Sequence, residues 1–246
     1  MTTWNKLRQT AFNSGSLGFV PTMGALHKGH LSLIKASIKN NDFTVVSIFL
    51  NPTQFNNSED FSNYPRTFEA DKNLLESEGV DILLIPDYSQ LYADGYKYNI
   101  LETEFSKLLC SKTRPGHFEG VLTVVMKLLN LVQPSTAYFG EKDYQQYLLV
   151  KGMARAFFLK TEIAACPIVR EADGLAYSSR NRRLSPEERR KAPLFYALLK
   201  SDLDPENITM ELKAAGFKVD YVEEIGNRRF GAVYAGEVRL IDNVVL

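Results

Sequence analysis

This chain of 246 residues is poor in cysteine and histidine, and it carries no net charge. Its two cysteines, Cys110 and Cys166, match no metal-binding or redox spacing and lie in apolar stretches, which predicts buried free thiols. Lys and Arg together number 29, as do Asp and Glu, so the composition shows no electrostatic footprint for nucleic acid or an acidic membrane. We therefore expect no protein-bound metal and no nucleic-acid partner.

Long hydrophobic runs, repeats and low-complexity tracts are also missing. No stretch approaches the roughly 20 apolar residues of a membrane span, and residues 1–6 contain no apolar core of a signal peptide. We therefore expect a cytoplasmic protein without a membrane partner. Hydrophobic residues make up 45% of the chain and charged residues 24%, which is ordinary for a globular protein of one or two domains.

Two of the three histidines, His27 and His30, stand in one short motif, residues 21–30. The motif follows an apolar run that predicts a buried strand, residues 17–20, and leads into a predicted helix that begins at Leu26. Both imidazoles then share one face of the first helical turn, where free backbone N–H groups and the helix dipole favour phosphate. We interpret the motif as a nucleotide triphosphate site whose imidazoles, neutral or cationic, donate to phosphoryl oxygens. The alternative is two surface histidines beside a turn glycine.

Predicted strands and helices alternate along the first two thirds of the chain. A continuous β-branched and apolar run is typical of a strand that is covered on both faces. Alternation of such runs with amphipathic segments predicts right-handed βαβ units and an α/β fold with a Rossmann-like, doubly wound parallel sheet. The predicted strands after the motif are residues 43–50, 80–86, 136–139 and 162–166, and the predicted helices are residues 67–78, 121–132 and 142–158.

Two features of this part bear on partners and ligands. The helix at residues 121–132 is apolar on nearly every side, so we expect it in a core or at the interface of a homodimer. Asn51 and Gln54 directly follow the strand at residues 43–50, where the ligand crevice of a parallel sheet lies. We expect both side chains to contact substrate.

The pattern changes after Val169, and we expect a domain boundary near residue 168. The predicted units are residues 1–168, a Rossmann-like domain for ATP and substrate, and residues 169–246, a small α+β lid domain. A polar loop at residues 170–181 is rich in hydrogen-bond donors. The elements predicted after it are a helix with a capping box at residues 185–199, a helix at residues 205–215, and strands at residues 217–223, 231–238 and 239–242.

Several motifs occur in one order along the chain from Gly18 to Asp242, and this ordered set resembles the pantothenate synthetase family, the ATP-dependent ligases that join pantoate to β-alanine. A single His-x-Gly-His motif would indicate only the wider nucleotidyltransferase superfamily. The motifs are Pro21-Thr22-Met23-Gly24 with His27 and His30, Asn51-Pro52-Thr53-Gln54-Phe55, Tyr64-Pro65-Arg66-Thr67, residues 114–121, residues 140–146, residues 169–176 and Ser178-Ser179-Arg180-Asn181.

The resemblance implies a set of site residues. It implies catalytic roles for His30, the donor, and for His27, Lys142 and Arg180. It implies that Gln54 binds pantoate and β-alanine and that Gln146 binds pantoate. His117 is more often a structural loop histidine, and we leave it out of the catalytic set. The ATP-binding residues that the resemblance implies are Met23, Gly24, Ala25, Leu26, His27, Lys28, Gly29, His30, Gly140, Glu141, Lys142, Asp143, Val169, Tyr177, Ser178, Ser179 and Arg180.

The implied reaction has two steps and uses ATP with Mg²⁺. The pantoate carboxylate attacks the α-phosphate and gives pantoyl adenylate, whose acyl carbon the β-alanine amine then attacks. Tyr177 departs from the family, which usually has methionine there. Without the resemblance, Gln146 would be interpreted as a solvated helix residue and Lys142 as an exposed helix-end lysine. The alternatives are a nucleotidyltransferase that leaves the adenylyl group on its product and a nucleotide-binding regulatory module without turnover.

Overall fold

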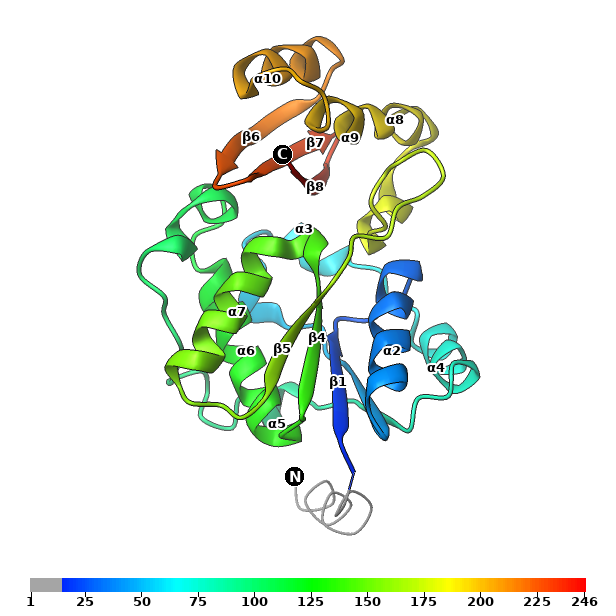
Figure 1. Ribbon diagram of the computed structural model, residues 1–246, viewed down its shortest axis with the longest axis vertical. Helices are drawn as coiled ribbons and strands as arrows, with labels where there is room; N and C mark the ends of the chain where they lie inside the picture. The colour runs from blue at the N-terminus through cyan, green and yellow to red at the C-terminus, as the bar shows by residue number, and fades with distance from the viewer. Residues whose placement is uncertain (1–14) are drawn as a thin grey trace.

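A parallel sheet forms the centre of the protein in the computed structural model, which describes residues 15–246. The strand order is β3-β2-β1-β4-β5, so β1 lies in the middle of the sheet, with β2 and β3 on one side and β4 and β5 on the other (Figure 1). This topology confirms the predicted Rossmann-like, doubly wound α/β sheet. The expectation that residues 1–6 contain no apolar core of a signal peptide concerns residues outside the described range. The strands are β1 (Leu17–Thr22), β2 (Phe43–Ile48), β3 (Ile82–Leu84), β4 (Thr136–Gly140) and β5 (Glu162–Cys166).

The side chains of the sheet alternate between two hydrophobic cores, one on each face. Phe19 packs with the core beneath α6 and α7, whereas its neighbour Val20 packs with the core beneath α2 and α4. This alternation follows from the period of two in a strand, and Figure 1 shows the helices in these two layers. The four helices are α2 (Lys28–Asn40), α4 (Phe68–Ser77), α6 (His117–Val132) and α7 (Tyr144–Ala156).

Helix α6 lies in the interior of this chain. Leu122, Val125 and Leu129 are among its side chains that are buried in the core of the parallel sheet. Of the two locations predicted for this apolar helix, the core is the one found. Its composition therefore needs no subunit interface as an explanation, and it gives no support to a homodimer.

The remaining elements of the first part are short. The predicted strand at residues 80–86 is reduced to β3, whose side chains are only partly buried because it is the edge strand of the sheet. The short helix α3 comes after β2 in the chain, and the short helix α5 comes after β3. The short elements are α3 (Ser58–Ser62), α5 (Tyr88–Leu91) and the 3₁₀ turns η1 (Pro52–Gln54), η2 (Phe105–Lys107), η3 (Leu109–Lys112), η4 (Glu141–Asp143) and η5 (Ser179–Arg183).

The C-terminal part is an antiparallel sheet of order β6-β7-β8 with helices on one face (Figure 1). The predicted α+β unit is therefore present, but two details of the prediction are wrong. The helix expected at residues 185–199 is interrupted at Ala192, before Pro193, and the strand expected at residues 231–238 crosses the turn at Gly236. The elements are α8 (Pro186–Lys191), α9 (Pro193–Leu199), α10 (Pro205–Ala214), β6 (Lys218–Ile225), β7 (Arg228–Ala235) and β8 (Val238–Val245).

A division of the chain near residue 168 remains a proposal. In its favour, the C-terminal part has a core of its own around Phe195 and Leu212. However, Tyr221 and Phe230 of the C-terminal sheet pack into the core of the parallel sheet. The two parts therefore share apolar contacts.

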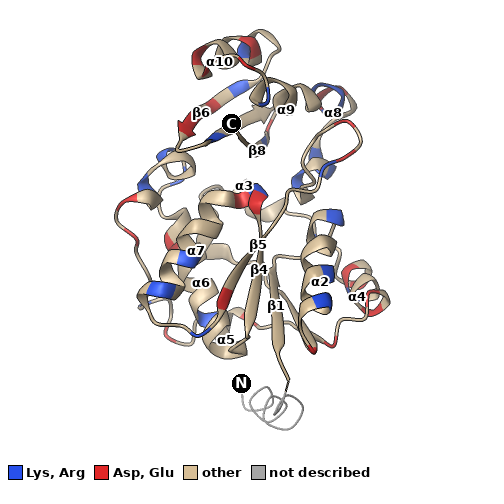
Figure 2. Cartoon of the chain, viewed as in Figure 1, with Lys and Arg blue, Asp and Glu red and all other residues tan. Residues whose placement is uncertain are grey.

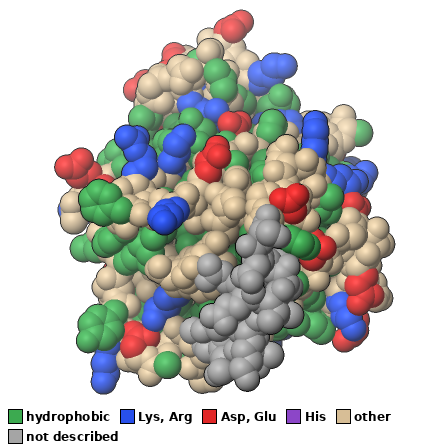
Figure 3. All heavy atoms as spheres, turned by 60° about the horizontal axis from the view of Figure 1, so that its bottom comes forward, with side chains coloured by type: hydrophobic (Ala, Val, Ile, Leu, Met, Phe, Trp, Pro, Cys, Tyr) green, Lys and Arg blue, Asp and Glu red, His purple; other side chains and the backbone are tan. Residues whose placement is uncertain are grey.

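Neither sign of charge is confined to one part of the described chain. Both signs occur in both parts of the chain (Figure 2), and on the face that Figure 3 shows, acidic and basic side chains are interspersed. Among residues 15–246, no helix has the length and apolarity that crossing a membrane requires.

Candidate functional site: a cleft at the carboxyl edge of the sheet

A cleft opens beyond the carboxyl ends of β1, β2, β4 and β5, and the segment after β5 closes one side of it. Its empty volume, counted out to the open mouth, is about 1230 Å³. Parallel α/β sheets bind their ligands at this edge. The predicted site residues that line it are Met23, His27, Gly29, His30, Asn51, Gln54, Gly140, Lys142, Asp143, Gln146, Val169, Tyr177, Ser178, Ser179 and Arg180.

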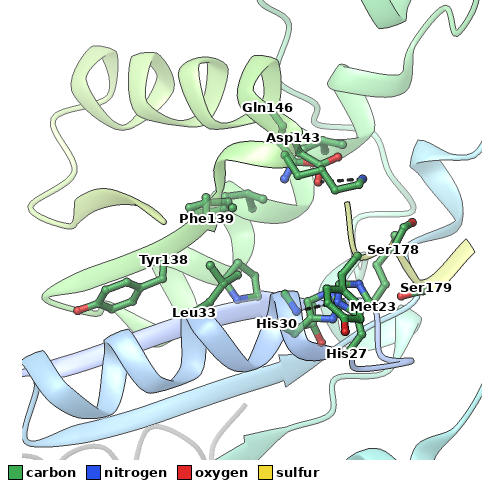
Figure 4. A pocket seen from close by; sticks show the side chains of 18 of the residues that line it. Met23, His27, His30, Leu33, Tyr138, Phe139, Asp143, Gln146, Ser178 and Ser179 are labelled. Carbon is green, nitrogen blue, oxygen red and sulfur yellow. Dashed lines mark hydrogen bonds and ion pairs between the residues drawn. The ribbon is translucent and has the colours of Figure 1, made fainter. Parts of the chain in front are cut away.

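His27 and His30 lie against each other at the start of α2, with ring centroids 4.0 Å apart and ring planes inclined by 30°. Figure 4 shows them across the cleft from Asp143 and Gln146. The Gly29 N–H donates to Nδ1 of His27 at 3.1 Å, which makes His27 the N-cap, so the helix begins later than predicted. A Cβ at Gly29 would lie 2.9 Å from the His27 ring, so this folded-back imidazole requires glycine there.

Burial favours the neutral form of both imidazoles. Burial, helped by the nearby His30, Lys142 and Arg182, lowers the pKa of His27 to about 2. Burial likewise lowers the pKa of His30 to about 4. Because Nδ1 of neutral His27 accepts a hydrogen bond, its proton is on Nε2. The rings can therefore donate N–H groups to a ligand, but positive charge has to come from the lysine and arginine side chains of the cleft.

Five residues that the resemblance assigns to ATP are not among those that line the cleft: Gly24, Ala25, Leu26, Lys28 and Glu141. The backbone N–H groups of Ala25 and Leu26 instead donate to the buried carboxylate of Asp71. The Lys28 side chain is exposed, and the Glu141 carbonyl accepts a hydrogen bond from the C-terminal sheet. A sequence motif does not separate residues that touch a ligand from residues that shape the turn beside it.

Asn51 and Gln54 occupy the predicted place after β2. Asn51 is 1% exposed, its Nδ2 donates to Oε1 of Gln54 at 3.1 Å, and its Oδ1 accepts from the Tyr92 hydroxyl at 2.9 Å. The Gln54 Nε2 lies 3.3 Å from Sδ of Met23. Asn51 thus orients Gln54 as well as lining the cleft, and the Gln54 amide is fixed with its N–H₂ toward the imidazole motif.

Two further side chains fix the backbone of Gln54. Nδ1 of His117 lies 2.8 Å from the Gln54 carbonyl oxygen, and Nη2 of Arg114 donates to the same oxygen at 3.2 Å. Burial, with the charge of Arg114 beside it, holds the pKa of His117 well below its usual value. A neutral His117 that donates to Gln54 has a structural role, in line with its omission from the catalytic set.

The opposite side of the cleft comes from β4, η4 and the first turn of α7. Lys142 is partly buried, and its Nζ lies 3.8 Å from Oδ2 of Asp143. The side-chain amide of Gln146 makes no hydrogen bond to another residue in the described range 15–246 and is partly buried (Figure 4). A half-buried amide without a protein partner is poised to bind a polar ligand.

The polar segment at residues 177–183 is fastened to the imidazole motif. The Ser179 hydroxyl donates to the Ala25 carbonyl oxygen at 2.9 Å, and Arg182 donates to that of Leu26 at 3.1 Å. Ser178 caps the 3₁₀ turn that follows it. These bonds bring segments about 150 positions apart into one site, which neither motif alone could show.

Arg180 enters the cleft from this segment with its charge already paired. Its guanidinium donates to both carboxylate oxygens of Asp60, at 2.8 and 3.3 Å, and Arg183 binds the same carboxylate at 2.6 Å. Burial works to lower the pKa of Arg180, but the hydrogen bonds and charge of Asp60 outweigh it and the pKa is raised. Arg180 therefore stays cationic in the cleft.

The sequence reasoning missed several residues of the site. Tyr64 lines the cleft, and burial raises the pKa of its hydroxyl. Tyr64 belongs to the motif Tyr64-Pro65-Arg66-Thr67, but no pattern in the sequence indicated its role. Asp60 accepts hydrogen bonds from Arg180, and Asp71 accepts them from the turn before α2. Acidic residues in helical segments are usually solvated, so the sequence indicated neither contact. The apolar wall from α6 could not be predicted because that helix is apolar on nearly every side; it consists of Val121, Val124, Val125 and Leu128.

The model of the protein family described as Pantoate-beta-alanine ligase matches residues 1–245 of this sequence. The chain belongs to the pantoate–β-alanine ligase family. The resemblance that the ordered motifs carried is thereby confirmed, as is the prediction of an enzyme of the ligase class. Within residues 15–246, no group of three His, Cys, Asp or Glu side chains is arranged to hold a metal ion.

Known members of the family match this chain over nearly its whole length. The pantothenate synthetase of Legionella pneumophila (strain Lens) is 52% identical over 243 residues, which are 99% of this chain and 96% of that protein. That of Bdellovibrio bacteriovorus is 54% identical over 231 residues, 94% of this chain and 92% of that protein. The crystal structure of the Francisella tularensis pantoate–β-alanine ligase, complexed with beta-gamma ATP and β-alanine, has a TM-score of 0.95 and 43% identity, covering 99% of this chain and 95% of that one. The Thermus thermophilus pantothenate synthetase has a TM-score of 0.90 and 40% identity, covering 98% and 97%.

Proposed function

We propose that this enzyme joins (R)-pantoate to β-alanine to give pantothenate, through a pantoyl adenylate, with release of AMP and pyrophosphate. The observation that carries the proposal is the set of side chains that line one cleft. Two imidazoles whose neutral form is favoured by burial, the side chains of Lys142 and Arg180, and the amides of two glutamines line the same space. The first four suit a triphosphate, and the two amides suit a small hydroxy acid.

The nucleotide side of the cleft is built for charge that develops on phosphate. In adenylyl transfer the bond between the α- and β-phosphates breaks while a carboxylate oxygen bonds to the α-phosphorus, so negative charge builds up on the leaving pyrophosphate. Lys142 and Arg180 supply fixed positive charge there, and His27 and His30 supply N–H donors. ATP enters as its Mg²⁺ complex.

His30 is the proposed catalytic donor. Its Nδ1 is buried and has no hydrogen-bond partner among the described residues. An unpaired buried nitrogen costs free energy, and a ligand in the cleft can pair with this one only if the ring turns. His27 donates through Nε2, because its Nδ1 is occupied by Gly29.

Gln54 and Gln146 bind pantoate from opposite sides of the cleft. Gln54 is fixed by Asn51, while Gln146 has no partner among the described residues, and together they can satisfy the hydroxyl and carboxylate oxygens of the acid. Gln54 also lies next to the β-alanine amine in the second step. That amine attacks the acyl carbon, the bond from the carbon to the AMP oxygen breaks, and the amine loses a proton.

No covalent enzyme intermediate is needed. Cys110 and Cys166 are buried and do not line the cleft, and burial raises the pKa of the Cys166 thiol. A thioester route would require a thiolate at the cleft. The adenylate itself supplies the leaving group that an amide bond requires.

We also propose that the enzyme acts in the cytoplasm and as a homodimer. Two buried free thiols suit a reducing compartment. The homodimer stays a prediction from the sequence, since the core of a single chain accounts for α6. Sedimentation equilibrium tests it directly.

Pyrophosphate release from ATP tests the proposed function, measured with a set of small hydroxy acids, each with and without β-alanine. We expect release sustained over many turnovers only with pantoate and β-alanine together, and AMP as the nucleotide product. Release with an adenylylated final product would instead indicate a nucleotidyltransferase. Binding of ATP without release under every condition would indicate a regulatory module.

A further inference from the structure

The turn before α2 is wrapped around a carboxylate of the protein itself. The backbone N–H of Ala25 donates to Oδ2 of Asp71 at 2.8 Å, and that of Leu26 donates to Oδ1 at 2.8 Å. The Thr67 hydroxyl donates to Oδ1 at 3.1 Å. Asp71 is 3% exposed and lies on α4, far from the turn in sequence. Among residues 15–246 no Lys or Arg forms an ion pair with it, so these donors stabilise the buried charge.

The backbone of the turn is shaped as an anion site. Gly24 and Ala25 both have positive φ, +81° and +51°, and such a left-handed turn aims successive N–H groups at one point. A Cβ on Gly24 would lie 3.2 Å from Oδ2 of Asp71, so the glycine also allows the close approach. An alanine in the left-handed region is strained, and the two hydrogen bonds to Asp71 offset that strain.

This anion site adjoins both imidazoles. His27 is the N-cap of α2 and directly follows Leu26, whose N–H is held by Asp71. The orientation of the His27 ring, and of the His30 ring stacked on it, therefore depends on the path of this turn. The two N–H groups that could have bound phosphate are already occupied.

We propose that Asp71 is a positioning residue, which holds the turn at residues 24–26 so that His27 and His30 face the triphosphate. On this account the turn contributes to the reaction through Asp71 and not by donating its own N–H groups to ATP. The inference rests on the proposed function for its kinetic readout. The position of the imidazoles can be tested without that function.

Chemical rescue tests the proposal. Asp71→Ala leaves the two N–H groups beside a space that formate can fill. We expect kcat for pantothenate synthesis to fall about 100-fold, the loss typical of a misplaced transition-state donor, and KM for pantoate to change less than threefold. Formate should restore kcat at least tenfold in a saturable manner, and chloride at the same ionic strength should not.

Asp81→Ala is the matched control. The Asp81 carboxylate accepts a backbone N–H, that of Thr44 at 2.7 Å, at the far end of the sheet from the cleft. We expect its kcat to stay within twofold of the parent and to be insensitive to formate. If Asp71→Ala does not fold, Asp71→Asn replaces it, with an expected tenfold loss of kcat at unchanged KM for pantoate.

Imidazole NMR without substrates separates this proposal from the proposed function. The chain has only three histidines, so single substitutions assign every ring resonance. We expect the His27 and His30 resonances to shift in Asp71→Ala and to return with formate, while that of His117 stays. Unmoved resonances, or a kcat within threefold of the parent, would overturn the positioning role. A parent enzyme without synthase activity whose imidazoles still respond would refute only the proposed function.

Discussion

Arg180, which lines the cleft, and Asp60 on α3 are joined by two hydrogen bonds, of 2.8 and 3.3 Å, although 120 positions separate them. Arg180 is the proposed phosphate ligand, and its guanidinium is already held by a protein carboxylate. Asp60 thus sets both where Arg180 lies and how much of its charge a nucleotide encounters. The two effects act in opposite directions on ATP affinity.

We expect the charge effect to dominate, so Asp60→Asn should bind ATP about threefold more tightly at low salt, because a negative charge near the triphosphate is removed. Asparagine can still accept a hydrogen bond from Arg180, so the side chain stays near its place. Glu59→Gln, on the same short helix, is the control that changes charge without this pairing. Titration calorimetry measures both, and weaker ATP binding by Asp60→Asn would mean that orientation of Arg180 matters more than its free charge.

Gln54→Ala and Gln146→Ala should weaken pantoate binding much more than ATP binding. Each substitution leaves a substrate oxygen unpaired in a partly buried site, at a cost of about 1–3 kcal/mol. We expect Gln54→Ala to raise the KM of β-alanine as well, whereas Gln146→Ala should leave it within twofold. Steady-state kinetics with each substrate varied in turn distinguishes these outcomes, and a collapse of ATP affinity in either variant would remove that glutamine from the pantoate site.

Stability should fall as the pH is lowered from 6.5 toward 4. The pKa of His30 is lowered to about 4 and that of His27 to about 2, so in this window the unfolded chain takes up protons that the folded chain does not. Stability from these groups is fully present above the unfolded pKa of about 6.5, and each contributes a slope of up to about 1.4 kcal/mol per pH unit below it.

His30→Gln should remove one such contribution and flatten the profile. Urea unfolding at pH 7, 6 and 5 measures the slope for the parent and the variant. Identical slopes in both proteins would show that His30 titrates normally in the folded state and that its neutral form is not built into the site.

Tyr177→Met, which introduces the residue usual in the family, should be tolerated. The centroid of the Tyr177 ring lies 6.2 Å from that of the His27 ring and 5.8 Å from Nζ of Lys28. Both contacts are peripheral. Methionine is flexible and can fill the same space. We expect kcat/KM for ATP to stay within about tenfold, which corresponds to ~1.4 kcal/mol. A greater loss would assign the tyrosine ring or hydroxyl a direct part in nucleotide binding.

The sequence was informative where a residue's role depends on its near neighbours. The apolar runs of β1 and β2 predict buried strands, and the position of Asn51 and Gln54 after β2 predicts their place in the cleft. Pairings over long separations carry no such local signal. Asp71 on the turn at residues 24–26 is one of these, and Asp60 on Arg180 is another.

The predicted bounds of some helices and strands differ from the observed bounds for a related reason. The helix after the imidazole motif starts at Lys28 because His27 folds back onto Gly29, and only the three-dimensional structure shows that contact. The strand expected at residues 80–86 is short because it lies at the edge of the sheet, and edge position depends on the topology of the whole domain. Neither property can be read from a local pattern of apolar residues.

Isotope exchange between pyrophosphate and ATP tests the central claim most directly. If the acyl adenylate forms first, labelled pyrophosphate should enter ATP when pantoate is present and β-alanine is absent. His30→Ala should lower the exchange rate about 10²–10³-fold, the loss expected for one preorganised donor, with its circular dichroism spectrum unchanged. Arg180→Ala should depress exchange and pantothenate synthesis together. Exchange that appears only after β-alanine is added would contradict the two-step account and favour a concerted reaction.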